Sequence, residues 1–198
     1  GTFVLSRPEV INGDSTYPGL GSNDFVPMDW NENNYHQLKI LYKPSPLTRV
    51  NFTQITNNKI SQYYDRMYKY NPEGQLKHFD NSRTSILQLT KNLTKNTYLN
   101  FGITNFNKKY EHFAFADQNE YVHNEVFSSR PYSFLTGGSN NSFFNRKTSS
   151  TVLKGDISSQ MKNNLVKLGF EYRIHKLDYY SSSYQPSINQ ISFDPSKD

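Results

Sequence analysis

Histidine and acidic side chains are the residues of this sequence that could ligate a metal or transfer a proton, and the chain has five His and 17 Asp plus Glu. His112 and His123 lie in a stretch that is rich in carboxylates and could bind a divalent cation. The acidic members of this group are Glu111, Asp117, Glu120 and Glu125. No two histidines have the close spacing of a ligand pair, cysteine is absent, and acidic loop residues are more often simply solvated. We therefore assign no metal ligand.

Residues for nucleophilic or phosphate chemistry are present without the spacing that such chemistry needs. Thr136-Gly137-Gly138-Ser139 is glycine-rich, but no Gly-Lys-Ser/Thr ending and no helical pattern follow it, so an external turn is the better interpretation. Serine, histidine and acidic residues also lack the spacing of a nucleophile elbow. The sequence therefore predicts no catalytic residues, no cofactor and no enzymatic activity.

Five charged residues near the carboxyl end alternate with apolar residues along two neighbouring segments. They are Lys154, Asp156, Lys167, Glu171 and Arg173. Because side chains alternate between the two faces of a strand, all five are expected on one polar face that lines the lumen of a barrel. They could contact a solute or an internal plug, or they could form cross-strand charge pairs of about 0.2–1 kcal/mol each that stabilise the wall. The second interpretation is preferred.

Alternation with a period of two residues, which is the pattern of β-strands, occurs in six segments of the chain. It is clearest from Val166 to Ile174, where even positions are apolar and most odd positions are polar or charged. Short turns at Pro44-Ser45-Pro46, Thr94-Lys95-Asn96 and Met161-Lys162-Asn163-Asn164 join the segments in pairs. The sequence therefore predicts three antiparallel hairpins.

The apolar face of the hairpins is expected to lie against lipid. Its members are Leu87, Leu89, Leu99, Phe101, Ile103, Leu153, Ile157, Val166, Leu168, Phe170, Tyr172 and Ile174. No apolar run approaches the roughly 20 residues of a membrane-spanning helix. A mean hydropathy of −0.80 together with 15 Tyr and 14 Phe is typical of a transmembrane barrel, in which only alternate residues face lipid.

Long connections, roughly 57–82 and 105–147, separate the hairpins. Tight turns at one end and long loops at the other are typical of outer-membrane barrels, whose strands of about 9–11 residues span the bilayer. The predicted fold is therefore all-β: a segment of an antiparallel transmembrane β-barrel with about six strands. Residues 34–178 are expected to form the strands with long external loops, and residues 1–33 and 179–198 to be extracellular loop regions. Because the smallest such barrels have about eight strands, the segment is expected to be incomplete.

Three segments together resemble the middle of the barrel in TonB-dependent outer-membrane receptors that have an amino-terminal carboxypeptidase-regulatory-like domain. They are Tyr68-Lys69-Tyr70-Asn71-Pro72-Glu73-Gly74, Phe134-Leu135-Thr136-Gly137-Gly138-Ser139-Asn140-Asn141 and Lys167-Leu168-Gly169-Phe170-Glu171-Tyr172-Arg173-Ile174-His175. The resemblance implies a bacterial outer-membrane receptor that takes up a scarce nutrient, such as a metal chelate, cobalamin or a glycan. It also implies outer-membrane lipid, the rest of the barrel and its plug, TonB (through a part absent from this sequence) and a small solute as partners.

Two other functions remain open from the sequence. A secreted β-sandwich adhesin or carbohydrate-binding module could use exposed Tyr and Trp30 as stacking platforms, although sandwiches have short loops at both ends. An outer-membrane structural or secretion component would share the barrel. The net charge of +5 is scattered along the chain, so we expect no nucleic-acid partner.

Overall fold

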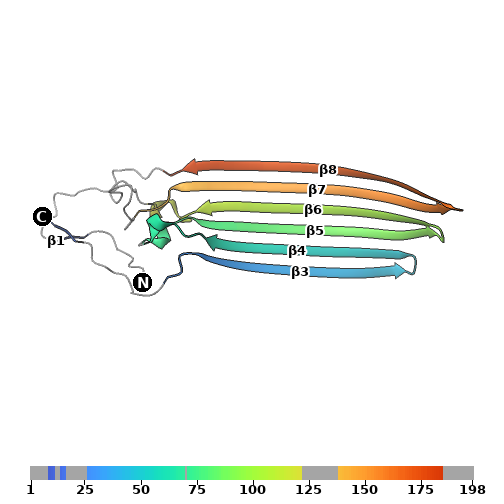
Figure 1. Cartoon of the computed structure of the whole chain (residues 1–198), viewed down its shortest axis with the longest axis horizontal. Coiled ribbons are helices and arrows are strands. Elements are labelled where there is room, and N and C mark those ends of the chain that lie inside the picture. The colour runs from blue at the N-terminus through green and yellow to red at the C-terminus, as the bar shows by residue number, and fades with distance from the viewer. Residues whose placement is uncertain (1–8, 12–13, 17–25, 70, 122–137, 185–198) are drawn as a thin grey trace.

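The protein folds into a single extended antiparallel sheet. The computed structural model describes residues 9–11, 14–16, 26–69, 71–121 and 138–184. Six strands follow one another in the order β3-β4-β5-β6-β7-β8, so that each strand pairs with its neighbour in the sequence (Figure 1). Their bounds are β3 Trp30–Ser45, β4 Thr48–Gln62, β5 Lys77–Thr94, β6 Thr97–Phe113, β7 Ser142–Met161 and β8 Asn164–Ser183. The predicted all-β, antiparallel class is confirmed.

Smaller elements accompany the main sheet. Strands β1 (Glu9–Ile11) and β2 (Asp14–Thr16) form a separate short hairpin. Three single-turn 3₁₀ helices lie in the connections: η1 (Arg66–Tyr68), η2 (Pro72–Gly74) and η3 (Gln118–Glu120). None of the helices in the described ranges is long and apolar enough to cross a membrane.

The three predicted hairpins are present with tight turns between their strands. Ile40 pairs with Phe52, Leu87 with Ile103, and Leu153 with Tyr172. In the last turn Lys162 has a φ of 53°, a left-handed conformation that is common in two-residue hairpin turns. All three turns lie at one end of the sheet, and the long connections β4–β5 and β6–β7 lie at the other (Figure 1).

The strands are longer than predicted, at 15 to 20 residues instead of about 9–11. The sheet starts at Trp30 and ends at Ser183, outside the expected limits of residues 34 and 178. Correspondingly, the connections expected at 57–82 and 105–147 shrink to 63–76 and 114–141. The added strand ends mix polar stretches such as Asn57-Asn58-Lys59 and Asn107-Lys108-Lys109 with scattered aromatic residues, so they lack regular apolar alternation. Cross-strand pairing with their neighbours satisfies their backbone groups and continues the ladder.

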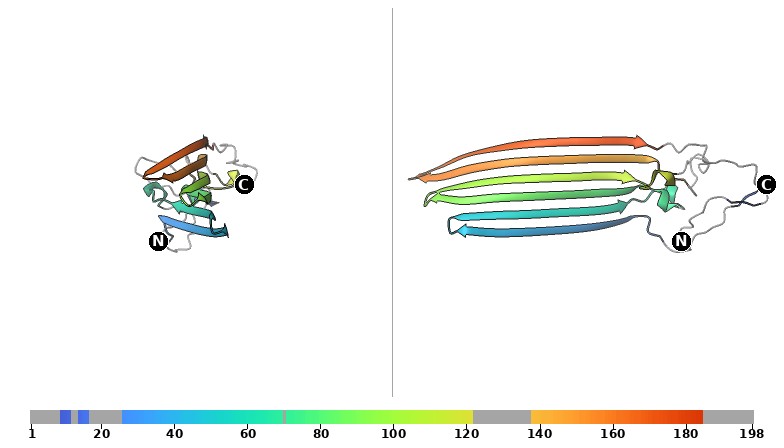
Figure 2. Two further views of the ribbon diagram at one scale, coloured as in Figure 1. Left: turned by 90° about the vertical axis from the view of Figure 1, so that its right-hand side faces the viewer. Right: turned by 180° about the vertical axis from the view of Figure 1, so that it is seen from behind.

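The sheet is twisted but is not closed into a barrel (Figure 2). Within the described ranges, β3 and β8 each have one paired side and one open side. The sheet is also a single layer, so large apolar side chains on it are exposed, for example Leu168 at 72%. Ordinary soluble domains cover such a face with a second layer.

Buried residues gather where the connections fold over the strand ends. Tyr68, Pro72, Ala114 and Tyr121 are buried apolar residues at this end of the sheet. Ser61, Gln62, Asn71 and Ser139 are buried at the same end. Their polar atoms are largely paired within the protein: the Gln62 side chain accepts from Trp30 Nε1 at 2.9 Å and donates to the Pro72 carbonyl at 2.7 Å.

Candidate functional site

One face of the sheet carries two rows of residues that are apolar, or glycine, in all six strands. Cross-strand pairing aligns Tyr42, Val50, Leu89, Phe101, Gly155 and Phe170 in one row, and Ile40, Phe52, Leu87, Ile103, Leu153 and Tyr172 in the next. The remaining residues predicted to face lipid lie on the same face: Leu99, Ile157, Val166, Leu168 and Ile174. We call this region the apolar band.

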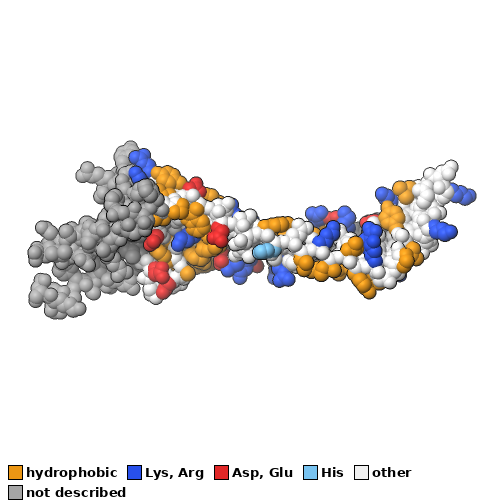
Figure 3. All heavy atoms as spheres, turned by 90° about the horizontal axis from the view of Figure 1, so that it is seen from below, with side chains coloured by type: hydrophobic (Ala, Val, Ile, Leu, Met, Phe, Trp, Pro, Cys, Tyr) orange, Lys and Arg blue, Asp and Glu red, His pale blue; other side chains and the backbone are white. Residues whose placement is uncertain are grey.

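The apolar band has a defined height on β8. From Val166 to Ile174 the band extends about 26 Å along the strand, which at the tilt of about 40° found in barrel strands corresponds to a height of roughly 20 Å, somewhat less than the band of about 25 Å on transmembrane barrels. Phe170 lies at its middle and covers Gly155 on the neighbouring strand, where an added Cβ would lie 2.5 Å from the ring. Figure 3 shows the sheet edge-on, with hydrophobic side chains along its lower side towards the turns.

The opposite face carries the five charged residues predicted from the sequence. Lys154 Nζ lies 3.7 Å from a Glu171 carboxylate oxygen, and the Arg173 guanidinium also pairs with Glu171. Asp156 instead accepts a hydrogen bond from the Asn100 amide at 3.0 Å, and Lys167 lies opposite Ser158. The structure thus brings three of the five together and holds the other two on the same polar face. The Lys154–Glu171 contact is a cross-strand charge pair of the kind that the preferred interpretation predicts.

A cluster of histidine and aromatic side chains lies on this polar face, near the long connections. His78 Nδ1 lies 2.7 Å from the Tyr110 hydroxyl, and the His78 and His112 rings are 5.4 Å apart. Tyr63, Phe144 and Arg146 border the pair: the ring of Phe144 stacks on His112, and Arg146 lies over Tyr110 at 5.6 Å. Such a surface of aromatic rings and hydrogen-bonding groups is suited to contact a solute.

Sequence reasoning missed this cluster because it placed His112 in a loop. His112 and Glu111 are in β6, and they point to opposite faces of the sheet, so they cannot share an ion. Within the described ranges no three His, Cys, Asp or Glu residues converge as metal ligands, and His123 and Glu125 lie outside them. The available signal was the alternation in three short segments, His78-x-Asp80, Tyr110-x-His112 and Phe144-x-Arg146. It would have predicted longer strands with these side chains on one face.

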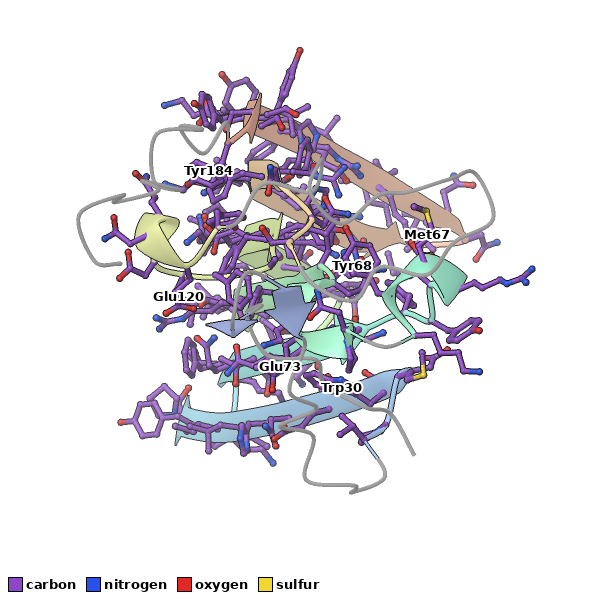
Figure 4. All side chains as sticks on the ribbon, turned by 90° about the vertical axis from the view of Figure 1, so that its left-hand side faces the viewer. Trp30, Met67, Tyr68, Glu73, Glu120 and Tyr184 are labelled. Carbon is purple, nitrogen blue, oxygen red and sulfur yellow. The ribbon has the colours of Figure 1, made fainter. Side chains whose placement is uncertain are left out.

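Figure 4 faces the end of the sheet where the two long connections lie, and hydrogen bonds join these connections there. The side-chain amide of Asn71 donates to the Gly138 carbonyl at 2.7 Å, and the backbone N–H of Asn140 donates to the Gly74 carbonyl at 2.8 Å. A Cβ on Gly74 would lie 2.5 Å from the Gly138 oxygen, so the approach requires glycine there. Two of the three segments behind the family resemblance are therefore in contact; residue 70 and residues 134–137 of those segments lie outside the described ranges.

Tyr121 fixes the start of the β6–β7 connection. Its hydroxyl donates to the Phe115 carbonyl at 3.0 Å, and its ring lies 4.5 Å from that of Tyr184, just beyond β8. Burial raises the pKa of the Tyr121 phenol above its ordinary value of 10.0. The connection is thus attached to the neighbouring strand end. Tyr68, the last residue of η1, is also buried at this end of the sheet.

No family model, curated protein or solved structure matches the chain. The resemblance to TonB-dependent receptors therefore stays a hypothesis that rests on the three segments.

Proposed function

We propose that this chain forms part of the barrel wall of a bacterial outer-membrane TonB-dependent receptor that takes up a scarce nutrient, such as a metal chelate, cobalamin or a glycan. The observation that carries the proposal is the apolar band: two complete rows across six strands, on one face of a single-layer sheet. The opposite face is mostly polar, the tight turns share one end, and the long connections share the other. The family resemblance supplies the receptor class.

Lipid is the environment that suits an uncovered apolar face of this height. In water, exposed side chains such as Leu168 and Phe170, which are 72% and 56% exposed, lack cover. A bilayer covers them without a second layer of protein. It also makes unpaired backbone groups costly, so the open edges of β3 and β8 must pair with further strands. In this proposal the remainder of the receptor barrel supplies those strands.

The polar face then lines the lumen. The ladder around Glu171 stabilises the wall or contacts the plug, and the histidine–aromatic cluster around His78 and Tyr110 contacts the solute near the extracellular mouth. The joined connections at Asn71 and Gly138 are external. TonB acts through a part of the receptor other than this wall.

A nitroxide scan along β8 tests the proposal. Single cysteines are placed from Val166 to Ile174 in the receptor, labelled, and reconstituted in vesicles, and collision with lipid-soluble oxygen and with a water-soluble nickel chelate is measured. Even positions should favour oxygen, and odd positions should favour nickel, with a period of two residues. A β-sandwich predicts low collision with both reagents at even positions, because a second sheet covers them. Either that pattern or nickel access at every position refutes the proposal.

A further inference from the structure

An open groove of about 570 Å³ crosses the face that carries the apolar band, on the side towards the long connections. The strands that form it are β4 to β8, and its lining includes Arg83, Lys109, Lys147, Lys176 and Asp178. Figure 3 shows Lys and Arg side chains along this side of the sheet, beyond the hydrophobic ones. On this face four lining residues are basic and one is acidic.

The four basic residues of this groove, the basic cluster, exceed the acidic residues beside them, so the groove has a net positive charge. Lys109 and Lys147 lie directly opposite each other on β6 and β7, and like charges in such a pair repel. Glu111 pairs with Lys109 at 2.7 Å, and Asp178 lies opposite Lys147. Arg83 and Lys176 lie opposite the neutral residues Asn107 and Ser149. Within the described ranges, neither of these two basic side chains has an acidic residue opposite it.

The spacing of the cluster suits more than one phosphate. Arg83, Lys109, Lys147 and Lys176 lie on four successive strands, which together span about 14 Å. Neutral hydrogen-bonding groups of Thr56, Asn58 and Asn107 line the groove between them and beside them. Phosphate oxygens accept hydrogen bonds from amide, hydroxyl and basic groups alike.

Position relative to the apolar band identifies the source of the phosphate. Arg83 and Lys176 lie four residues beyond Leu87 and Tyr172 of the second apolar row, about 13 Å further along the strands. A lipid whose acyl chains lie against the band therefore has its headgroup at the height of the groove. A soluble anion would gain nothing from the adjoining apolar surface.

We propose that this groove binds the phosphorylated headgroup of a membrane lipid in the outer leaflet, with its phosphates on the basic cluster and its acyl chains on the apolar band. The inference rests on the proposed function, because it requires this face to meet lipid. It adds a specific lipid site on the outside of the wall, distinct from the solute-contact surface on the other face.

The test measures lipid A binding to the purified receptor in detergent. The variant R83Q/K147Q/K176Q removes three charges from the groove, and K39Q/R49Q/K59Q removes three from the polar face as a matched control. Each basic side chain near an anionic surface contributes roughly a fivefold change in affinity, so the groove variant should bind diphosphorylated lipid A on the order of 100-fold more weakly. The control should stay within about threefold of the parent. A third variant, R83K/K147R/K176R, keeps the charges and should keep the binding.

Two further probes identify the ligand chemistry. Dephosphorylated lipid A has the same acyl chains and should bind as weakly to the parent as diphosphorylated lipid A binds to the groove variant. Inorganic phosphate should not displace bound lipid A. Equal binding of both lipid A forms, or an unchanged groove variant, overturns the inference. Full displacement by inorganic phosphate overturns it in favour of a free-anion site. If the nitroxide scan shows period-two alternation while lipid binding ignores phosphate, only this inference fails; without that alternation, both fail.

Discussion

Replacing Phe170 with Asp tests the physical basis of the apolar band at the point where it should matter most. Phe170 lies in the first complete apolar row, four residues from both Val166 and Ile174. It is thus about 13 Å along the strand from either end of the band, close to the bilayer midplane of the proposed barrel. A carboxylate facing lipid at that depth costs about 3 kcal/mol.

Two comparison variants separate the lipid effect from a general effect of substitution in β8. Glu171→Gln changes the adjacent residue on the other face and weakens its ion pairs with Lys154 and Arg173, for which we expect about 0.5 kcal/mol. Ile174→Asp introduces the same carboxylate at the end of the band, for which we expect about 1 kcal/mol or less. The order of cost should therefore be Phe170→Asp, then Ile174→Asp, then Glu171→Gln.

The assay is urea-induced unfolding of the receptor in lipid vesicles, followed by far-UV circular dichroism, together with the fraction of each variant assembled in the outer membrane. Phe170→Asp should lower both, whereas Glu171→Gln should leave assembly near that of the parent. Equal stability of the Phe170→Asp and Glu171→Gln variants would refute the assignment of the faces. A cost at Ile174 equal to that at Phe170 would refute the depth assignment alone.

Three further predictions concern single contacts. Gly155→Ala should displace the Phe170 ring and lower the free energy of urea unfolding by about 1 kcal/mol. Gly102→Ala is the control and should lower it less, because the nearest atom to the added Cβ would be 3.8 Å away. Equal losses in the two variants would contradict the ring contact. Gly74→Ala should separate the two connections, because the added Cβ would clash with the Gly138 oxygen. Amide hydrogen exchange at Asn140 should then become faster, while exchange in β8 should not change. Unchanged exchange at Asn140 would contradict this contact. Since burial raises the pKa of Tyr121, its contribution to holding the 114–121 segment should be complete below the unfolded value of about 10 and lost as the pH rises through the folded value. Amide exchange at Phe115 should show this alkaline loss in the parent and not in Tyr121→Phe; the same profile in both would contradict it.

The sequence was informative where one face of a strand is apolar and the other polar. Val166 to Ile174 and Leu99 to Ile103 show this alternation, and a shift of one residue would turn every apolar side chain to the wrong face, so the pairing is strongly specified. The hairpin turns, the strand order and the shared face of the five charged residues all follow from it.

The outer halves of the strands could not be found in the same way. Segments such as Asn57-Asn58-Lys59 and Asn107-Lys108-Lys109 are polar on both faces, and their strand conformation depends on the neighbour to which they hydrogen bond. The cluster around His78 and Tyr110 was missed for this reason. The contact of Asn71 with Gly138 joins residues 67 apart in the sequence, and no local pattern reports such a contact.

The neighbour-to-neighbour order of the sheet has a consequence for how the chain folds. Every ladder in β3 to β8 joins strands that are adjacent in the sequence, three of them through turns of two residues. Closing a two-residue turn costs little chain entropy, and each hairpin can then extend residue by residue from its turn. The two long connections need to close only after the hairpins beside them exist. Assembly can thus proceed as the sequential docking of three preformed hairpins, with the rate set by the docking steps across residues 63–76 and 114–141.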